Sequence, residues 1–384
     1  MTEGEGALHR LDGVLSTSGY FWTLCLVGED QSEKFSRLTS ELRAPFSATG
    51  DGKRISSGFS YWGVESTVAW LHACSDLFYP VMRASIESFP HRWSQLLPSV
   101  TGQGFHYVSL GTGTGHKDHT VLETLQRGRA GELCYVPVDV SPEMLRQGQR
   151  EALRGLGLRA SNVVPVQLDF AGARNARRLR RLVEELVGDE PVLYALAGNT
   201  LANFESDTGL LAMLVRELLR PQDRFLLEVA TTGALDEPSA LAAAQEYQAS
   251  PRFGEFVTSA VMQYTDLHID MDSVSFEPAV EDDRALMVKV VYRNRTGAPL
   301  RLTLPDRSRI DFPESDTIRL LITRKYAEQG LVKLLGDARA QEVDRYRSGS
   351  HAGYGEPRFG MDLMLLRSAA PAPAAAPPPP NPFT

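Results

Sequence analysis

Short apolar runs alternate with longer stretches of helical periodicity along the chain from about residue 105. The apolar runs predict seven β-strands, at 105–110, 132–138, 163–168, 192–197, 225–230, 318–323 and 359–366. Between the first five, apolar residues recur every three or four positions and predict helices at 119–126, 142–153, 173–186 and 209–219. Strands that alternate with helices are typical of a mostly parallel sheet covered on both faces. We therefore expect an α/β fold built on a seven-stranded, doubly wound sheet.

Two further regions do not fit a minimal sheet of this kind. In the first hundred residues, the segments 67–78 and 81–89 carry apolar faces at helical spacing. Between the fifth and sixth strands, the chain inserts two predicted helices and two predicted strands, at 240–248, 253–264, 273–277 and 286–294. Together these elements are sufficient for a second, α+β lobe that caps the sheet and binds the substrate.

The expected domain organisation has four parts. Residues 1–55 form an N-terminal extension, and 56–234 together with 311–368 form the domain that contains the sheet. Residues 235–310 form the inserted lobe, to which the N-terminal helices add. The alanine- and proline-rich segment 369–384 favours polyproline II and cannot build a packed core, so we expect a disordered tail.

Composition and charge exclude several classes of protein. The chain has 40 lysines and arginines against 48 aspartates and glutamates, a formal net charge of −8 that disfavours binding to nucleic acid. No apolar run approaches the roughly 20 residues that span a bilayer, and no secretory signal is visible at the start. We expect a cytoplasmic protein without a membrane partner. The three cysteines lie far apart and predict neither a disulfide framework nor a metal site.

A glycine-rich loop directly follows the first predicted strand of the sheet. Its sequence is Gly111-Thr112-Gly113-Thr114-Gly115. Glycines at alternate positions let the backbone turn sharply from strand to helix and approach a ligand closely, where amide groups and the helix dipole are available. By itself such a loop is also compatible with a tight turn that binds nothing.

Two carboxylates strengthen the ligand interpretation. Asp139 ends the second predicted strand, where an acidic side chain can bind the hydroxyls of a ribose, and Asp169 ends the third. In an open α/β sheet the ligand crevice lies at the carboxyl ends of the strands, so the loop and both aspartates converge there. The glycine spacing departs from the dinucleotide pattern, and no Gly-Lys-Ser/Thr run is present for a triphosphate. S-adenosylmethionine (SAM), a nucleoside without phosphate, fits these residues.

Three segments carry a resemblance to a known family. They are 109–117 (SLGTGTGHK), 135–141 (YVPVDVS) and 197–204 (AGNTLANF). In these segments the chain resembles the SAM-dependent histidine Nα-methyltransferases of ergothioneine biosynthesis, together with related enzymes that methylate tryptophan-derived or indole substrates. The resemblance covers roughly residues 55–368 and is strongest over 105–230. The third segment is the specific part, because generic methyltransferases lack it.

The resemblance implies a class I SAM-methyltransferase fold and a role for each matching residue. The residues matching the cofactor site are Gly111, Thr112, Gly113, Lys117, Asp139, Asp169 and Phe170. Asn203 matches the asparagine that grips the amino-acid portion of the substrate, and Tyr79 matches a tyrosine that lines the amine pocket. Tyr247 matches the tyrosine that holds the carboxylate, and Tyr61 is a candidate near the same pocket. Tyr79 and Asn203 are thus the candidate catalytic residues, and Tyr79 would orient the lone pair of the amine.

The predicted strand at 318–323 departs from the family pattern. The histidine enzymes carry a glutamate and then a serine on the corresponding strand, and these hold the imidazole; here the matching residues are Leu321 and Thr323. A leucine cannot accept a hydrogen bond from imidazole, and a pocket built for that bond rejects ligands that lack it. We therefore expect an acceptor other than histidine, with an apolar or aromatic side chain.

These observations predict a methyltransferase that transfers a methyl group from SAM to the amino nitrogen of an amino acid or an amino-acid-derived small molecule. The product of the cofactor is S-adenosylhomocysteine. Two alternatives stay open: methylation of an indole nitrogen or carbon, or of a hydroxyl, and a SAM-binding regulator without turnover. The basic segment 174–181 is interpreted as a solvated helix face. We expect no nucleic-acid partner and a monomer or homodimer.

Overall fold

The computed structural model describes residues 25–28, 31–50, 52–76, 80–347 and 359–369. Two predictions made from the sequence lie outside the described residues. They are the position of the candidate Tyr79 and the tail beyond residue 369.

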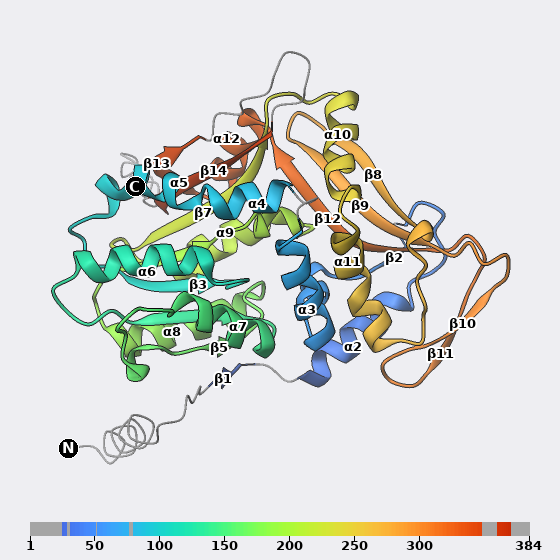
Figure 1. Ribbon diagram of the computed structural model, residues 1–384, viewed down its shortest axis with the longest axis horizontal. Coiled ribbons are helices and arrows are strands. Elements are labelled where there is room, and N and C mark those ends of the chain that lie inside the picture. The colour runs from blue at the N-terminus through green and yellow to red at the C-terminus, as the bar shows by residue number, and fades with distance from the viewer. Residues whose placement is uncertain (1–24, 29–30, 51, 77–79, 348–358, 370–384) are drawn as a thin grey trace, which may run out of the picture.

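A large sheet forms the centre of the fold (Figure 1). Twelve strands join in it, and seven of them follow one another in the order β5-β4-β3-β6-β7-β14-β13. Their bounds are His106–Leu110 (β3), Tyr135–Asp139 (β4), Val166–Gln167 (β5), Val192–Leu196 (β6), Arg224–Thr232 (β7), Ala340–Tyr346 (β13) and Phe359–Ser368 (β14). The first five are parallel, whereas β14 runs antiparallel to both β7 and β13. This arrangement confirms the fold class predicted from the sequence.

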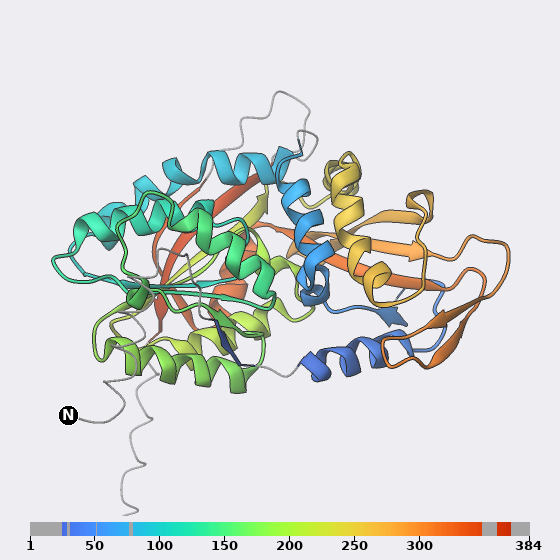
Figure 2. The ribbon, with the colours of Figure 1, turned by 60° about the horizontal axis from the view of Figure 1, so that its bottom comes forward.

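Helices cover both faces of this sheet (Figure 2). One face packs against Phe89–Val100 (α5), His116–Gly128 (α6) and Pro142–Ala152 (α7). The other packs against Ala173–Val187 (α8), Asp207–Leu218 (α9) and Glu328–Asp337 (α12). The basic segment lies on α8, where Leu179 and Val183 are buried against the sheet while Arg177 and Arg178 are exposed. The strands of this sheet are apolar at nearly every position, so both of its faces must be buried.

A second group of elements lies beside these seven strands, on the right of Figure 1, and includes further strands of the same sheet. It contains Gln31–Leu42 (α2), Ser57–Tyr61 (η1), Val64–Cys74 (α3), Glu237–Gln248 (α10), Pro251–Tyr264 (α11), Val274–Glu281 (β8), Ala285–Arg293 (β9), Thr317–Tyr326 (β12) and the hairpin Leu300–Thr303 (β10) with Arg309–Phe312 (β11). These elements share a separate hydrophobic core. Asp236 and Ser250 start α10 and α11 by accepting hydrogen bonds from backbone N–H groups of the first turn, and each is followed by a proline near the helix start.

Short elements complete the described chain. They are Leu26–Val27 (β1), Lys53–Arg54 (β2), Pro80–Glu87 (α4), Ala160–Asn162 (η2), Thr200–Asn203 (η3) and Met271–Ser273 (η4). In the part of the chain that the structure describes, none of the helices combines the length and the apolar character that a membrane crossing requires. The domain limits expected from the sequence stay a prediction.

One predicted strand pairs differently from the expectation. The strand at 318–323 lies within β12, which pairs antiparallel with β9 along its length and meets β7 only at the pair Tyr326↔Thr231. The remaining strand of the seven is instead β13, which pairs with β14 at the sheet edge. The sequence pattern is misleading because β12 is buried at every position, whereas β13 is mostly polar and partly exposed.

Candidate active site

A cavity of about 670 Å³ lies at the carboxyl ends of the parallel strands. Its walls come from the loops after β3, β4, β5 and β6 on one side and from α2, η1 and α3 on the other. β4 and β6 are both neighbours of β3, one on each of its edges. The direction in which successive strands are added therefore reverses at β3. A crevice at such a reversal is the usual ligand site of open α/β sheets, and its size suits a small molecule.

The glycine loop after β3 forms one wall of this cavity. Gly111 and Gly113 have φ of +78° and +52°, and a Cβ atom at either would meet no atom closer than 3.9 Å. Their missing side chains therefore leave space on the cavity wall for a ligand. Gly115 differs, because its Cβ would lie 2.0 Å from the carbonyl oxygen of Gly148 in α7. The third glycine thus allows α6 and α7 to pack closely.

Asp139 is a buried carboxylate that faces the same cavity. Asp139 is the last residue of β4 and is 6% exposed, and its Oδ1 accepts a hydrogen bond from the backbone N–H of Ser141 at 3.0 Å. Burial raises the pKa of Asp139 to about 6. Nearby, the hydroxyl of Thr112 is buried without a hydrogen-bond partner among the described residues. Both groups have polar capacity left for a ligand.

The far end of the cavity is lined by Asp169 and Phe170, which follow β5. Asp169 Oδ1 accepts from the backbone N–H of Ala171 at 3.0 Å, and its Oδ2 lies 3.8 Å from Nη1 of Arg37. Arg37 belongs to α2, which also contributes Lys34 to the lining. The N-terminal extension, for which the sequence indicated no role, therefore contributes to this end of the site.

Lys117 lies on α6 at the cavity wall and belongs to a buried charged cluster. Its Nζ donates to a carboxylate oxygen of Glu228 and, at 2.5 Å, to the hydroxyl of Ser85. Glu228, on β7, is fully buried and also accepts from Arg92 and, at 2.7 Å, from the backbone N–H of Gly198. Burial alone would raise the pKa of Glu228, but the charges of Lys117 and Arg92 lower it.

Asn203 and Tyr61 meet where the cavity adjoins a smaller recess. Asn203 Nδ2 donates to the hydroxyl of Tyr61 at 3.2 Å, and both residues also line this recess of about 30 Å³. The recess residues that do not line the cavity include Tyr247, Leu321 and Thr323. Burial raises the pKa of the Tyr61 hydroxyl, which therefore stays protonated near neutral pH.

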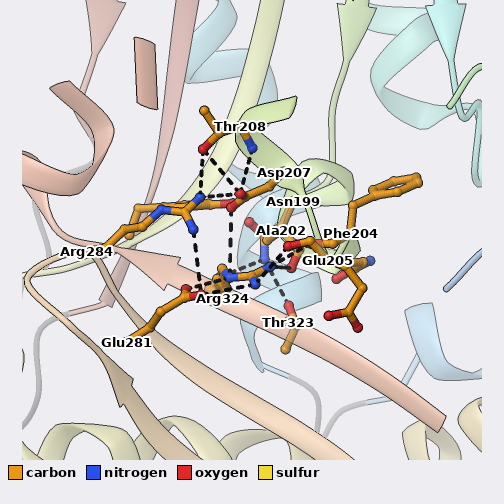
Figure 3. Close-up of polar contacts among 12 residues, drawn as sticks. Asn199, Ala202, Phe204, Glu205, Asp207, Thr208, Glu281, Arg284, Thr323 and Arg324 are labelled. Carbon is orange, nitrogen blue, oxygen red and sulfur yellow. Dashed lines mark hydrogen bonds and ion pairs between the residues drawn. The ribbon is translucent and has the colours of Figure 1, made fainter. Parts of the chain in front are cut away.

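A polar network holds the segment between β6 and α9 in place (Figure 3). Asn199 starts this segment in the left-handed region, with φ of +63°, and is bonded to β7 and β12. Arg324 of β12 donates to the carbonyls of Ala202 and Phe204 at 3.3 and 2.7 Å, on either side of Asn203. Arg324 is held in turn by Glu281, at 2.7 Å. The position of Asn203 is therefore fixed by contacts from both groups of elements.

Apart from Tyr79, which lies outside the described residues, the predicted site residues fall into three sets. All those predicted for the cofactor line the main cavity: Gly111, Thr112, Gly113, Lys117, Asp139, Asp169 and Phe170. Tyr61 and Asn203 line both spaces, and Tyr247, Leu321 and Thr323 line the recess. Sequence reasoning missed Glu228 and the α2 residues Lys34 and Arg37. A glutamate within an otherwise apolar strand was the available signal for Glu228, because a buried charge requires partners.

Solved structures that are similar to this chain have low sequence identity to it. A SAM-dependent methyltransferase from Clostridium acetobutylicum is 14% identical, with 72% of this chain and 89% of that chain covered and a TM-score of 0.36. The magnesium protoporphyrin IX methyltransferase of Synechocystis is 12% identical, with 80% and 97% covered and a TM-score of 0.39. The 1,6-didemethyltoxoflavin-N1-methyltransferase of Burkholderia thailandensis is 15% identical, with 82% and 92% covered and a TM-score of 0.35. No curated protein matches the chain.

The family comparison is decisive. The family model described as histidine-specific methyltransferase, SAM-dependent, matches residues 72–352, which is more than half of the chain. The match includes the glycine loop, both aspartates and Asn203, all of which line the cavity. The protein is therefore a SAM-dependent methyltransferase, and the chain belongs to the histidine-specific, SAM-dependent methyltransferase family.

Proposed function

We propose that this enzyme methylates the amino nitrogen of an amino acid, or of a small molecule derived from one, and that its substrate is not histidine. The acceptor carries an apolar or aromatic side chain. The observation that carries this proposal is the recess, where Leu321 stands among uncharged residues next to Asn203 and Tyr61.

The residues around the cavity fit SAM. Asp139 offers a buried carboxylate for the ribose hydroxyls, and Asp169 and Phe170, which line the same cavity, would hold the adenine. The open glycine positions and Lys117 suit the amino-acid tail, because backbone amides and an ammonium group bind a carboxylate. When bound, SAM supplies a methyl group on a positively charged sulfur.

The substrate residues bind and orient the amine. Asn203 presents an amide whose position is fixed by Arg324, and it shares a hydrogen bond with Tyr61. These groups suit the polar end of an amino acid and hold its nitrogen toward the glycine loop. Positioning of this kind is the main catalytic contribution available, and it is worth about 7–11 kcal/mol in well-oriented systems.

The junction of the recess with the main cavity, where Tyr61 and Asn203 line both spaces, also favours the neutral amine. None of the described residues that line the recess carries a charged side chain. An ammonium ion loses hydration on entering such surroundings without gaining a counter-charge, so the pKa of the amine falls there. A neutral amine has the free lone pair that attack requires. The enzyme therefore needs no strong base beside the nitrogen, provided that the proton leaves to solvent.

Leu321 is the reason for excluding histidine. It is 3% exposed and presents only methyl groups to the recess. A ring N–H placed against it would lose its hydrogen bond to water without gaining another, at a cost of about 1–3 kcal/mol. The same cost does not arise for a side chain without a donor.

A substrate panel tests this proposal. Purified enzyme is incubated with SAM and, separately, each of the twenty amino acids and a set of indolic amines, and the products are identified by mass. We expect added methyl groups on one or more amino acids with apolar or aromatic side chains. Turnover of histidine above all others would contradict the proposal, and SAM binding without any methylated product would favour a regulatory protein.

The affinity for S-adenosylhomocysteine is expected to rise with pH through about 6. The ionised form of Asp139 accepts hydrogen bonds from ribose hydroxyls, whereas burial raises the pKa of the free carboxyl to about 6. Binding must therefore release a proton below this pH, and the dissociation constant should increase about tenfold for each unit below it. Calorimetry between pH 5 and 8 measures the effect. The Asp139→Asn variant should lose this dependence, and an unchanged profile in that variant would assign the titration to another group.

A further inference from the structure

We propose that Asp118 binds the ammonium group of the cofactor's amino-acid tail, so that Asp118 and Lys117 together recognise the two charges of this tail. In SAM and in S-adenosylhomocysteine, the tail carries an ammonium and a carboxylate on the same carbon atom. Lys117 and Asp118 are consecutive residues of opposite charge in the first turn of α6, and both line the main cavity. This inference rests on the placement of the tail at the glycine loop that is proposed above.

Asp118 is a buried carboxylate that three hydroxyl groups hold in place. Its side chain belongs to a residue that is 3% exposed, in the helix that starts directly after the glycine loop. Tyr107 and Ser109 of β3 donate to Oδ1 at 2.7 and 2.9 Å. Tyr135 of β4 donates to Oδ2 at 2.6 Å. The carboxylate is therefore fixed before a ligand arrives, which lowers the entropic cost of binding.

The Asp118 carboxylate keeps hydrogen-bonding capacity for a ligand. Its two oxygens offer about four acceptor positions. Oδ1 accepts two hydrogen bonds and Oδ2 accepts one, so Oδ2 can accept one more. The three donors are neutral, and no residue of the described part of the chain forms an ion pair with Asp118. A cationic group of a ligand would supply the counter-charge that a buried carboxylate requires.

The other carboxylates of the cavity do not offer this combination. Among the described residues, the carboxylates that line it are Glu41, Asp118, Asp139, Asp169 and Glu205. Asp139 and Asp169 follow β4 and β5 and are the residues proposed for the ribose and the adenine. Glu41 and Glu205 have side chains that are 19% and 52% exposed, and both form ion pairs with arginines. Asp118 is thus the buried carboxylate of this set that adjoins the glycine loop and has no other proposed role.

Two cofactor analogues test this inference by calorimetry at pH 8. One is S-adenosylhomocysteine, and the other lacks only its amino group. We expect the wild type to bind S-adenosylhomocysteine at least about tenfold more tightly, because the analogue loses a hydrogen bond between charged groups. In Asp118→Asn, which keeps the shape of the side chain, this ratio should fall to about two. A purely structural role of Asp118 would weaken both ligands equally and leave the ratio unchanged.

Tyr107→Phe provides the matched control. It removes one of the three hydroxyl donors to Asp118 and keeps the carboxylate, so the preference for the amino group should stay at least about tenfold. Equal binding of the two ligands by the wild type overturns the inference, and this outcome needs no variant. A preference that survives in Asp118→Asn, or one that is also lost in Tyr107→Phe, overturns it as well. Thermal unfolding of each variant verifies that it is folded.

A third ligand separates this inference from the proposed placement of the cofactor. It keeps the amino group of S-adenosylhomocysteine and lacks the carboxylate. Its affinity for the wild type should be about tenfold weaker than that of S-adenosylhomocysteine, and the difference should shrink in Lys117→Met. If the difference does not shrink, the tail does not lie beside Lys117, and the placement and the inference fail together. If it shrinks while the preference for the amino group survives in Asp118→Asn, the inference alone fails.

Discussion

Asp139→Ala is expected to raise the dissociation constant of S-adenosylhomocysteine about 100-fold. The Asp139 carboxylate faces the cavity and is 6% exposed, so hydrogen bonds that it accepts from a ribose are shielded from water. Hydrogen bonds to charged groups contribute about 1.5–3 kcal/mol each. The variant loses two such bonds, but part of this loss is offset because it no longer buries a charge. The net loss of binding free energy is about 3 kcal/mol, which corresponds to roughly a factor of 100 in the dissociation constant. Calorimetry at pH 8 measures it.

A carboxylate on the protein surface gives the matched control for this change. Asp311 lies on β11, in the hairpin away from the cavity, and its side chain is 80% exposed. Asp311→Ala should leave the dissociation constant within a factor of two. If Asp139→Ala also binds within about threefold of the wild type, the ribose is not held by this residue.

Glu228→Gln is expected to lower the free energy of unfolding by about 3–5 kcal/mol. The wild-type carboxylate is fully buried between the charges of Lys117 and Arg92. The variant would leave these two cations close together and without a counter-charge, and breaking a buried ion pair by removing one partner costs this much. Urea denaturation followed by circular dichroism measures the change.

An exposed ion pair on α6 provides the control for Glu228. Glu123 and Arg127 pair across one helical turn at 2.6 Å, with side chains 42% and 74% exposed. Glu123→Gln makes the same chemical change and should cost no more than about 0.5 kcal/mol. Because the pKa of Glu228 is lowered in the folded protein, its stabilising effect is full above the ordinary glutamate pKa of 4.5 and is lost as the pH falls below that value. A loss under 1 kcal/mol at pH 7 in Glu228→Gln would contradict the assigned charges.

The glycine loop and the two aspartates of the main cavity could be predicted because they lie at or just after the ends of strands. The glycine loop comes after β3, Asp139 ends β4, and Asp169 follows β5. Parallel strands place their carboxyl ends at one edge of the sheet, so local sequence position determines spatial position there. Each of these residues lines the main cavity.

The pairing of strands could not be read from apolar character alone. β12 is buried throughout, as a central strand would be, but its neighbour is β9 in the second group of elements. β13 was not predicted, because its sequence contains Glu342, Asp344 and Arg345 and resembles a loop. An edge strand needs little apolar surface, so hydrophobic pattern is a weak guide to it.

The remaining site residues depend on contacts between distant segments. Arg92 and Lys117 reach Glu228 from α5 and α6, more than 100 residues away along the chain. Arg37 reaches the cavity from a helix that precedes the segment matched by the family model. No local pattern encodes such encounters. The family resemblance pointed to Asn203, which lines the cavity and the recess, and to Leu321, which lines the recess.

A competition experiment with labelled SAM separates the proposed acceptor from its alternatives. The enzyme is given SAM with a ¹³C-labelled methyl group, histidine, and an equal concentration of the best acceptor from the panel, and NMR correlations locate the label. We expect the label on the α-nitrogen of an apolar or aromatic amino acid, with histidine modified at least about tenfold more slowly because its ring N–H is left unpaired beside Leu321. Label on an indole ring or a hydroxyl, or preferential labelling of histidine, would contradict the proposed function.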